Sequence, residues 1–189
     1  MTESDEMKTI MDEVAACRRC VLHGARKRTV PGEGGDHARI MLIGEAPGYN
    51  EDVQGRPFVG RAGAFLDELL SSVGLKRNDV FITNILKCRP PGNRNPKSEE
   101  IKSCTPYLDR QIALLAPATI CPMGNFAAGY ILEKFGIKPA PIGSIHGKTF
   151  RIKSLIMDAR IIPLYHPASA IYNPNMRNTL LEDFKNVAE

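Results

Sequence analysis

Residues 40–48 read Ile-Met-Leu-Ile-Gly-Glu-Ala-Pro-Gly, an apolar run that leads directly into a turn rich in glycine and proline. A short apolar run bounded by turn residues is typical of a strand buried in a parallel sheet. Ligands of open α/β sheets bind beyond the carboxyl ends of such strands. Carboxylates at Glu51-Asp52 and an aromatic ring at Phe58 follow the turn. This set suits a flat, polar, stackable ligand such as a nucleobase.

Outward from this stretch, apolar strands alternate with amphipathic helices. Further strands are predicted at residues 80–85, 118–122 and 160–164, a short edge strand at 149–152, and helices at 9–17, 62–73, 98–115, 125–135 and 176–187. Ser98 is the predicted N-cap of its helix. The alternation predicts a parallel sheet with helices on both faces, in one domain over residues 1–189.

The composition is that of an ordinary globular protein, with 43% hydrophobic and 24% charged residues. No apolar run approaches the roughly 18 residues that a membrane span needs, and the polar start at residues 1–6 lacks the apolar segment of a signal peptide. We therefore expect a cytoplasmic protein with no membrane partner. The net charge of +4 is compatible with a polyanionic partner.

Four of the five cysteines form a pattern. Cys17 and Cys20 are spaced C-x2-C, and Cys88 and Cys104 flank a proline-rich loop. In an intracellular chain such cysteines are metal ligands or free thiols more often than disulfides. Four thiolates suit either a four-iron cluster or a zinc ion, and the spacing alone leaves both open. Cys121 falls within a predicted strand and is expected to be a small core residue.

Basic residues crowd the same loops: Arg18, Arg19, Arg26, Lys27 and Arg28 after the first cysteine pair, and Lys87, Arg89, Arg94 and Lys97 around Cys88. A metal site that holds these loops together would present cations to a nucleic-acid backbone. The alternative is an ordinary solvated surface.

Polar residues follow two other predicted strands. Asn84 ends the second strand, and His166 opens the segment HPAS after the fourth. Because the carboxyl ends of parallel strands share one edge of the sheet, we expect both residues to meet the first turn in one cleft. The Asn amide offers the donor and acceptor that match O4 and N3–H of uracil, Phe58 offers a stacking face, and His166 offers stabilisation of negative charge on a departing base. Taken singly, each has an ordinary explanation, as a turn residue, a core aromatic or a structural histidine.

Together the motifs GEAPGYNEDVQGRPFVGRAG at 44–63, TNILKCRPPGNRNP at 83–96, HPAS at 166–169 and the four cysteines resemble the family-four uracil-DNA glycosylases, the iron–sulfur branch found in archaea and bacteria. The resemblance implies an α/β, single-domain three-layer sandwich with a central four-stranded parallel sheet flanked by helices. It also implies a [4Fe–4S] cluster on Cys17, Cys20, Cys88 and Cys104, which orders DNA-facing loops rather than moving electrons.

The resemblance further implies the residues of a uracil site. The substrate-binding set is Gly44, Glu45, Ala46, Phe58, Asn84, Asn93 and His166, and the catalytic set is His166, Glu51 and Asn84. Ala46 stands where the best-known glycosylase branch has a water-activating Asp, so the general base stays open. Glu51 is a candidate to position water or to offset positive charge on the sugar.

The expected function is therefore that of a monofunctional DNA glycosylase. It would hydrolyse the N-glycosidic bond of deoxyuridine in single- or double-stranded DNA, release uracil and leave an abasic site. We expect a monomer acting in the prokaryotic cytoplasm on nucleoid DNA. The alternatives are a non-catalytic iron–sulfur DNA-binding module of the same fold and an electron-transfer protein. Tyr172 and Met176 are candidates to wedge into the duplex.

Overall fold

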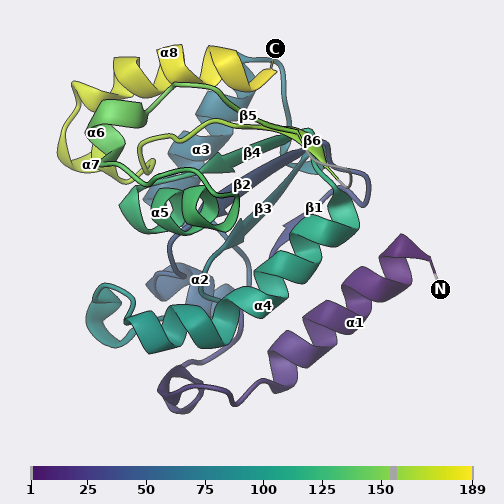
Figure 1. The fold of residues 1–189 in the computed structure, drawn as a ribbon. Helices are drawn as coiled ribbons and strands as arrows, with labels where there is room; N and C mark the ends of the chain where they lie inside the picture. The colour runs from purple at the N-terminus through teal and green to yellow at the C-terminus, as the bar shows by residue number, and fades with distance from the viewer. Residues whose placement is uncertain (1, 154–156, 189) are drawn as a thin grey trace.

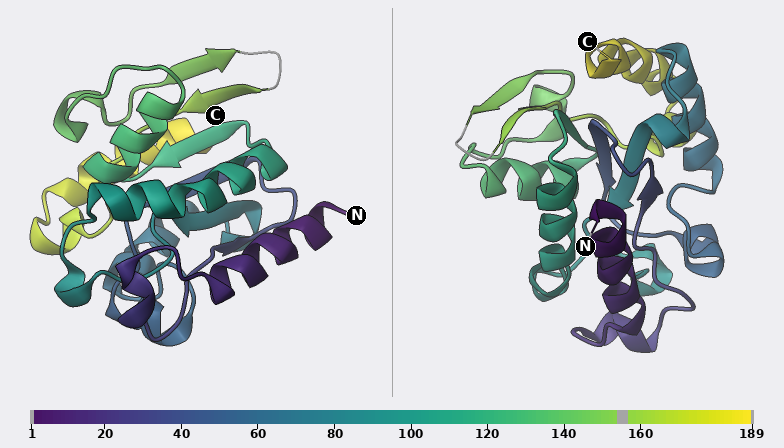
Figure 2. Two further views of the ribbon diagram at one scale, coloured as in Figure 1. Left: turned by 60° about the horizontal axis from the view of Figure 1, so that its bottom comes forward. Right: turned by 90° about the vertical axis from the view of Figure 1, so that its right-hand side faces the viewer.

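The computed structural model describes residues 2–153 and 157–188. A mixed six-stranded sheet in the order β1-β3-β2-β4-β6-β5 forms its centre, with helices on both faces (Figures 1 and 2). The strands are β1 (Glu33–Gly34), β2 (Ile40–Gly44), β3 (Val80–Asn84), β4 (Thr119–Pro122), β5 (Phe150–Lys153) and β6 (Asp158–Ile161). The helices are α1 (Glu3–Ala16), α2 (Tyr49–Gln54), α3 (Arg61–Ser72), α4 (Ser98–Leu115), α5 (Asn125–Lys134), α6 (Ile142–Ile145), α7 (Ser169–Tyr172) and α8 (Met176–Ala188).

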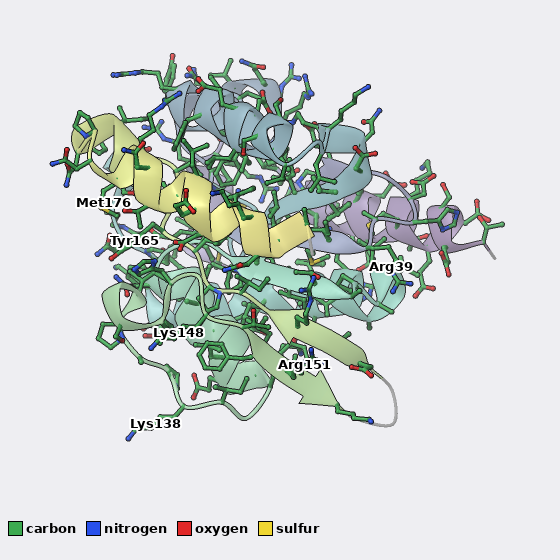
Figure 3. The ribbon with its side chains drawn as sticks, turned by 90° about the horizontal axis from the view of Figure 1, so that it is seen from above. Arg39, Lys138, Lys148, Arg151, Tyr165 and Met176 are labelled. Carbon is green, nitrogen blue, oxygen red and sulfur yellow. The ribbon has the colours of Figure 1, made fainter. Side chains whose placement is uncertain are left out.

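Strand β2 lies at the centre and contributes to both apolar layers. Met41 and Ile43 pack into the cluster formed with α4 and α5, whereas Leu42 packs into the cluster formed with α3 and α8. All three side chains are fully buried. Because successive side chains of a strand point to opposite faces, a strand covered on both sides must be apolar throughout. Helix α8 begins at Met176 (Figure 3) and packs on the same face of the sheet as Leu42 and α3.

The predicted parallel core is confirmed, and the sheet is larger than four strands. Strands β3, β2, β4 and β6 pair in parallel, and β1 and β5 add antiparallel edges. Strand β5 corresponds to the predicted edge strand. Strand β1 was missed because it has only two residues and its pairing depends on close backbone approach: a Cβ at Gly34 would lie 2.0 Å from the Val80 carbonyl oxygen.

Three local details differ from the sequence prediction. The N-terminal helix begins at Glu3, because Thr2 and Asp5 form a reciprocal capping box. The cap of α4 is Lys97 rather than Ser98, and its N–H donates to the Glu100 carboxylate at 2.8 Å. Helix α2 lies within the first motif, where no helix was predicted.

The register brings the motif-bearing strand ends to one edge of the sheet. Gly44 of β2 pairs with Asn84 of β3, and a bridge between Met123 and Leu164 continues the β4–β6 pairing toward His166. Cys121 is fully buried in the core, as expected. Over the described residues, no helix has both the length and the apolar character needed to cross a membrane.

Candidate active site and cysteine pocket

A cleft of about 320 Å³ opens at the carboxyl edge of the parallel strands. It is lined by residues of the first motif, of the loop after β3 and of the HPAS segment, namely Glu45, Ala46, Pro47, Gly48, Glu51, Phe58, Ala62, Asn84, Pro90, Asn93, Arg94, His166 and Ala168. Except for Gly44, every residue of the expected uracil site lines this one cleft. Six further residues line the cleft without having been predicted as site residues: Pro47, Gly48, Ala62, Pro90, Arg94 and Ala168. Five of them have no polar side chain, and Arg94 was predicted only as a cation facing a nucleic-acid backbone.

Gly44 lies beneath the cleft floor. A Cβ at this position would lie 2.3 Å from Asn84 Oδ1 and 2.7 Å from Phe58 Cζ. The missing side chain therefore allows the Asn84 amide and the Phe58 ring to close over the end of β2. Any larger residue would push apart the two side chains expected to hold a base.

The Asn84 side chain has a buried acceptor without a partner. The residue is 2% exposed, and among the described residues its Oδ1 atom has no hydrogen-bond partner. An unsatisfied buried polar atom costs about 1–3 kcal/mol. Because Asn84 lines the cleft, a ligand with an N–H group in that position would remove this cost.

Phe58 is held in a strained conformation. Its φ of 51° lies in the left-handed region, which is uncommon for a bulky residue. Arg77 fixes the backbone by donating to the carbonyl oxygens of Phe58 at 3.0 Å and Pro57 at 2.7 Å. The Phe58 ring stacks with the His166 ring at a centroid distance of 5.4 Å. The left-handed backbone at Phe58 thus places an aromatic face beside the His166 imidazole.

The His166 ring is in a defined neutral form. Its Nδ1 accepts the Ala168 N–H at 3.1 Å, which leaves the proton on Nε2. Burial lowers the pKa of His166 to about 4, although the Glu51 charge opposes that shift. At neutral pH the imidazole is therefore an uncharged donor through Nε2–H.

Two carboxylates line the cleft and differ in their surroundings. Glu51 accepts N–H groups from Gly48 at 3.1 Å, Val59 at 2.9 Å and Gly60 at 3.1 Å, so it ties the first turn to the loop that carries Phe58. The Glu45 carboxylate has no partner among the described residues, and burial raises its pKa. The sequence alone did not show that Glu51 holds the loop or that Glu45 has no partner among the described residues.

Asn93 lies at the rim of the cleft. Its φ of 54° is again left-handed, and its Oδ1 accepts from Arg89 Nε at 2.7 Å. Nearby, Arg94 lines the cleft and forms a bidentate ion pair with the buried Glu100, at 2.9 and 2.6 Å. The rim is therefore ordered by basic side chains.

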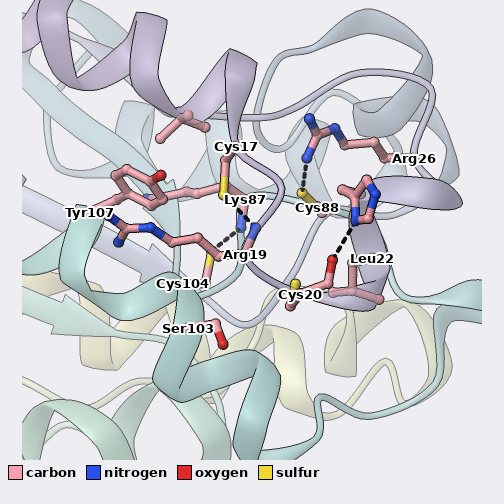
Figure 4. Close-up of a pocket in the computed structure, with 12 residues that line it drawn as sticks. Cys17, Arg19, Cys20, Leu22, Arg26, Lys87, Cys88, Ser103, Cys104 and Tyr107 are labelled. Atoms are coloured by element: carbon pink, nitrogen blue, oxygen red, sulfur yellow. Dashed lines mark hydrogen bonds between the residues drawn. The ribbon is translucent and has the colours of Figure 1, made fainter.

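The four patterned cysteines line a second pocket (Figure 4). Cys17 and Cys20 are half-buried, Cys88 and Cys104 are buried, and all are free thiols whose sulfurs face a common space. Within residues 2–153 and 157–188, no group of three or more His, Cys, Asp or Glu side chains is placed to hold a single metal ion. Ala46 of the cleft packs against this cysteine-bearing cluster, so the two pockets are neighbours.

The sulfurs receive N–H groups from three basic residues. Lys87 N–H lies 3.2 Å from Cys104 Sγ, the Arg26 guanidinium 3.3 Å from Cys88 Sγ, and Arg19 N–H 3.5 Å from Cys17 Sγ. Burial raises the pKa of Cys104 to about 11, and the Lys87 charge opposes this shift. The hydrogen bonds from Lys87 and Arg26 oppose the effect of burial, because they favour the negatively charged form of Cys104 and Cys88.

Lys87 lies between the two pockets and is not the DNA-facing cation that its sequence position indicated. It is 1% exposed. Its ammonium group donates to Thr83 Oγ1, to the Asn84 carbonyl oxygen at 3.0 Å and to Gln111 Oε1 at 2.8 Å. Burial lowers its pKa to about 7. Lysine is almost never fully buried, so no sequence signal marks this role.

The two wedge candidates lie away from the lining of the cleft. Tyr172 ends the short helix α7 and is 87% exposed, and Met176 begins α8. The segment between the HPAS motif and the last helix thus contains a helical turn. Insertion of either side chain into a duplex stays a prediction.

Comparisons with known proteins match the chain to one superfamily. The family model "Uracil DNA glycosylase superfamily" matches residues 31–187. The type-4 uracil-DNA glycosylase of Sulfurisphaera tokodaii is 47% identical over 98% of this chain and 84% of its own length. That of Archaeoglobus fulgidus is 42% identical over 98% of this chain and 93% of its own length. A type-5 enzyme of Thermus thermophilus is 34% identical over 64% of this chain.

Gly63→Ala tests how Phe58 is held. The added Cβ would lie 1.8 Å from the Phe58 carbonyl oxygen, so the backbone must shift and the free energy of unfolding should fall by about 1–3 kcal/mol or more. Urea denaturation measures this change. Gly129→Ala in α5 is the matched control, because its Cβ meets nothing within 4 Å. Equal stability of the two variants would contradict the packing role of Gly63.

The His166 tautomer is testable by nitrogen-15 NMR of labelled histidine. At pH 6 we expect a neutral ring protonated on Nε2, since its pKa is lowered to about 4. Because the folded-state pKa lies below the usual 6.5, the stability that His166 contributes is present above pH 6.5 and is lost as the pH falls through about 4. A His166 ring that titrates near pH 6.5 would overturn this assignment.

Proposed function

The chain belongs to the uracil DNA glycosylase superfamily, and on that premise we propose that it is a monofunctional uracil-DNA glycosylase. It hydrolyses the N-glycosidic bond of deoxyuridine in DNA, releases uracil and leaves an abasic site. The observation that carries the proposal is the Asn84 Oδ1 atom, which has no partner in the described part of the chain and is buried in a cleft beside Phe58 and His166. The names of relatives 42% and 47% identical support the same reaction.

Uracil is selected after extrusion from the DNA into the cleft. Its N3–H donates to Asn84 Oδ1, and its O4 accepts from the Asn84 amide nitrogen. Cytosine has an acceptor at N3 and an amine at position 4, so both contacts would become mismatched. Leaving buried polar groups unpaired is an effective way to reject an analogue. Phe58 supplies the face against which the base lies.

Bond cleavage creates opposite charges at the base and the sugar. As the C1′–N1 bond breaks, its electron pair passes to uracil, and His166 Nε2–H donates to O2, where negative charge develops. A water molecule adds its oxygen to C1′ and gives up a proton, which passes through solvent to the uracil anion, so that neutral uracil and an abasic site are the products. Glu51 holds the loop and offsets the positive charge of the sugar. Glu45, whose carboxylate has no partner where the structure describes the chain, is available to orient the water. A neutral His166 is consistent with this scheme, because its Nε2–H can donate a hydrogen bond to uracil O2 while the ring stays uncharged.

The cysteine pocket is the proposed site of a [4Fe–4S] cluster held by Cys17, Cys20, Cys88 and Cys104. Four sulfurs around a common space, with N–H donors directed at three of them, fit a group of several metal atoms. When bound, the cluster supplies covalent cross-links among the end of α1, the loop after β3 and α4. This proposed role is structural, and the steps of the hydrolysis described above use only side chains of the cleft.

DNA is the proposed macromolecular partner, in single- or double-stranded form, and the protein acts as a monomer in the prokaryotic cytoplasm. Arg94 at the cleft and the exposed basic residues after Cys20 are suited to phosphate contacts. A non-catalytic DNA-binding module of the same fold is the less favoured alternative. Such a module has no need of Phe58, Asn84 and His166 in one cleft.

Asn84→Ala and His166→Ala test the assigned roles. Each variant should lower kcat/KM for uracil release by roughly 10²-fold, because each removes a contact to the base in the transition state. The substrate is a labelled oligonucleotide with one deoxyuridine opposite guanine, treated with alkali after incubation to break the chain at abasic sites; thymine replaces uracil in the control oligonucleotide. Asn78→Ala, an exposed residue just before β3, is the control variant. Unchanged rates in both site variants would refute the mechanism.

Cys88→Ala tests the cluster. We expect loss of bound iron and of visible absorption in anaerobically purified protein, together with a lower Tm, because one of the four proposed ligands, the one that ties the loop after β3 to the cluster, is removed. Cys121→Ala is matched in chemistry, and its thiol lies in the core outside the cysteine pocket, so its iron content should equal that of the wild type. Equal iron content in both variants would exclude Cys88 as a ligand.

A further inference from the structure

Tyr49 is an exposed aromatic residue that the proposed reaction does not use. It follows Gly48, which lines the cleft, and begins helix α2. Its exposed fraction is 55%, and it belongs to none of the three apolar clusters of the core. Its hydroxyl makes no hydrogen bond with the described residues. Among the described residues, neither the apolar core nor a hydrogen bond of the hydroxyl therefore accounts for an aromatic ring at this position.

Two cations lie beside the Tyr49 ring. Lys27 Nζ is 5.1 Å and Arg89 Cζ 5.2 Å from the ring centroid. Both distances are within the range of a cation–π interaction. Neither cation forms an ion pair with an acidic side chain among the described residues. Their charges are therefore available to an anionic ligand next to an aromatic face.

Hydrogen bonds fix both cation-bearing loops. The Lys27 backbone N–H donates to Asp52 Oδ1 at 2.9 Å, and Asp52 is a buried residue of α2, the helix that Tyr49 begins. Arg89 donates to Asn93, which lines the cleft. The ring and the two charges thus come from three separate segments whose positions are set by the protein itself, which distinguishes this group from mobile surface side chains.

We propose that Tyr49, Lys27 and Arg89 form a second nucleotide subsite at the rim of the uracil cleft. An unstacked base next to the extruded uridine stacks on Tyr49, and the adjoining phosphates bind Lys27 and Arg89. Stacking platforms flanked by cations are how proteins bind single-stranded nucleic acid without reading its sequence. The subsite rests on the proposed function of the cleft and adds a substrate preference to it.

The preference follows from the state of the neighbouring base. In single-stranded DNA that base is free to leave its neighbours and stack on Tyr49. In a duplex it is paired, and unpairing it costs a few kcal/mol. Tyr49 should therefore contribute to the binding of single-stranded substrates and contribute little to that of duplexes. Lys27 and Arg89 would contribute to both, because phosphates are present in both.

The test compares Tyr49→Ala with Tyr49→Phe on single-stranded oligonucleotides with one deoxyuridine. One oligonucleotide has normal neighbours, and the other has abasic residues on both sides of the uridine, which keep the phosphates and remove the bases. Tyr49→Ala should raise KM roughly 5- to 100-fold on the first and leave KM little changed on the second. Tyr49→Phe should keep the wild-type KM because it keeps the ring. An equal effect on both substrates, or none, would overturn the stacking role.

A second measurement separates failure of the subsite from failure of the proposed function. The chain has no tryptophan, so Tyr49→Trp introduces a single fluorescent reporter. Titration with single-stranded DNA that lacks uracil should change its fluorescence saturably, whether or not the protein excises uracil. An unchanged signal in a variant that still excises uracil would reject the subsite alone. Saturable binding without any excision by the wild type would reject the glycosylase and leave the subsite standing.

Discussion

The parallel pairing of β2 with β3 is the constraint on which the site depends. Its register sets Gly44 beside Asn84, and the missing side chain at Gly44 is what lets the Asn84 amide and the Phe58 ring meet over the strand end. Phe58 in turn stacks on His166, which follows the distant strand β6. A base-sized cleft therefore arises from one backbone register and one glycine. The strain at Phe58 is the cost of this arrangement, and Arg77 offsets part of it.

The buried Lys87 joins the cleft to the cysteine pocket. Its backbone N–H is directed at Cys104 Sγ, and its ammonium group holds the carbonyl oxygen of Asn84. Burying an ammonium group is expensive unless oxygen atoms or negative charge surround it. Three oxygen acceptors meet part of this need, and the uncompensated part lowers the pKa of Lys87 to about 7. Because Lys87 contacts both pockets, through its backbone and through its side chain, the residue expected to read the base is positioned by the same segment that provides Cys88.

Elements that are marked by a local pattern of apolar residues could be predicted from the sequence. The buried run at residues 40–43 and the apolar stripe of α3 are such patterns, and the strand-end rule correctly brought Asn84 and His166 into one cleft. Features set by tertiary contact were not predictable. The two-residue strand β1, the burial of Lys87 and the capture of Glu51 by three backbone N–H groups each depend on a partner far away in the sequence or on loop geometry.

Floor and rim of the cleft are stabilised differently, and this difference bears on how a base enters. The floor is built from strand ends and buried side chains, so its geometry follows from the sheet itself. The rim is built from loops, held by the Asp52 carboxylate, by the Arg89–Asn93 hydrogen bond and by the cysteine pocket. Loosening the cysteine pocket should therefore disturb DNA capture, a property of the rim, more than selection among bases, a property of the floor. Affinity and specificity are in this sense assigned to separate parts of one small fold.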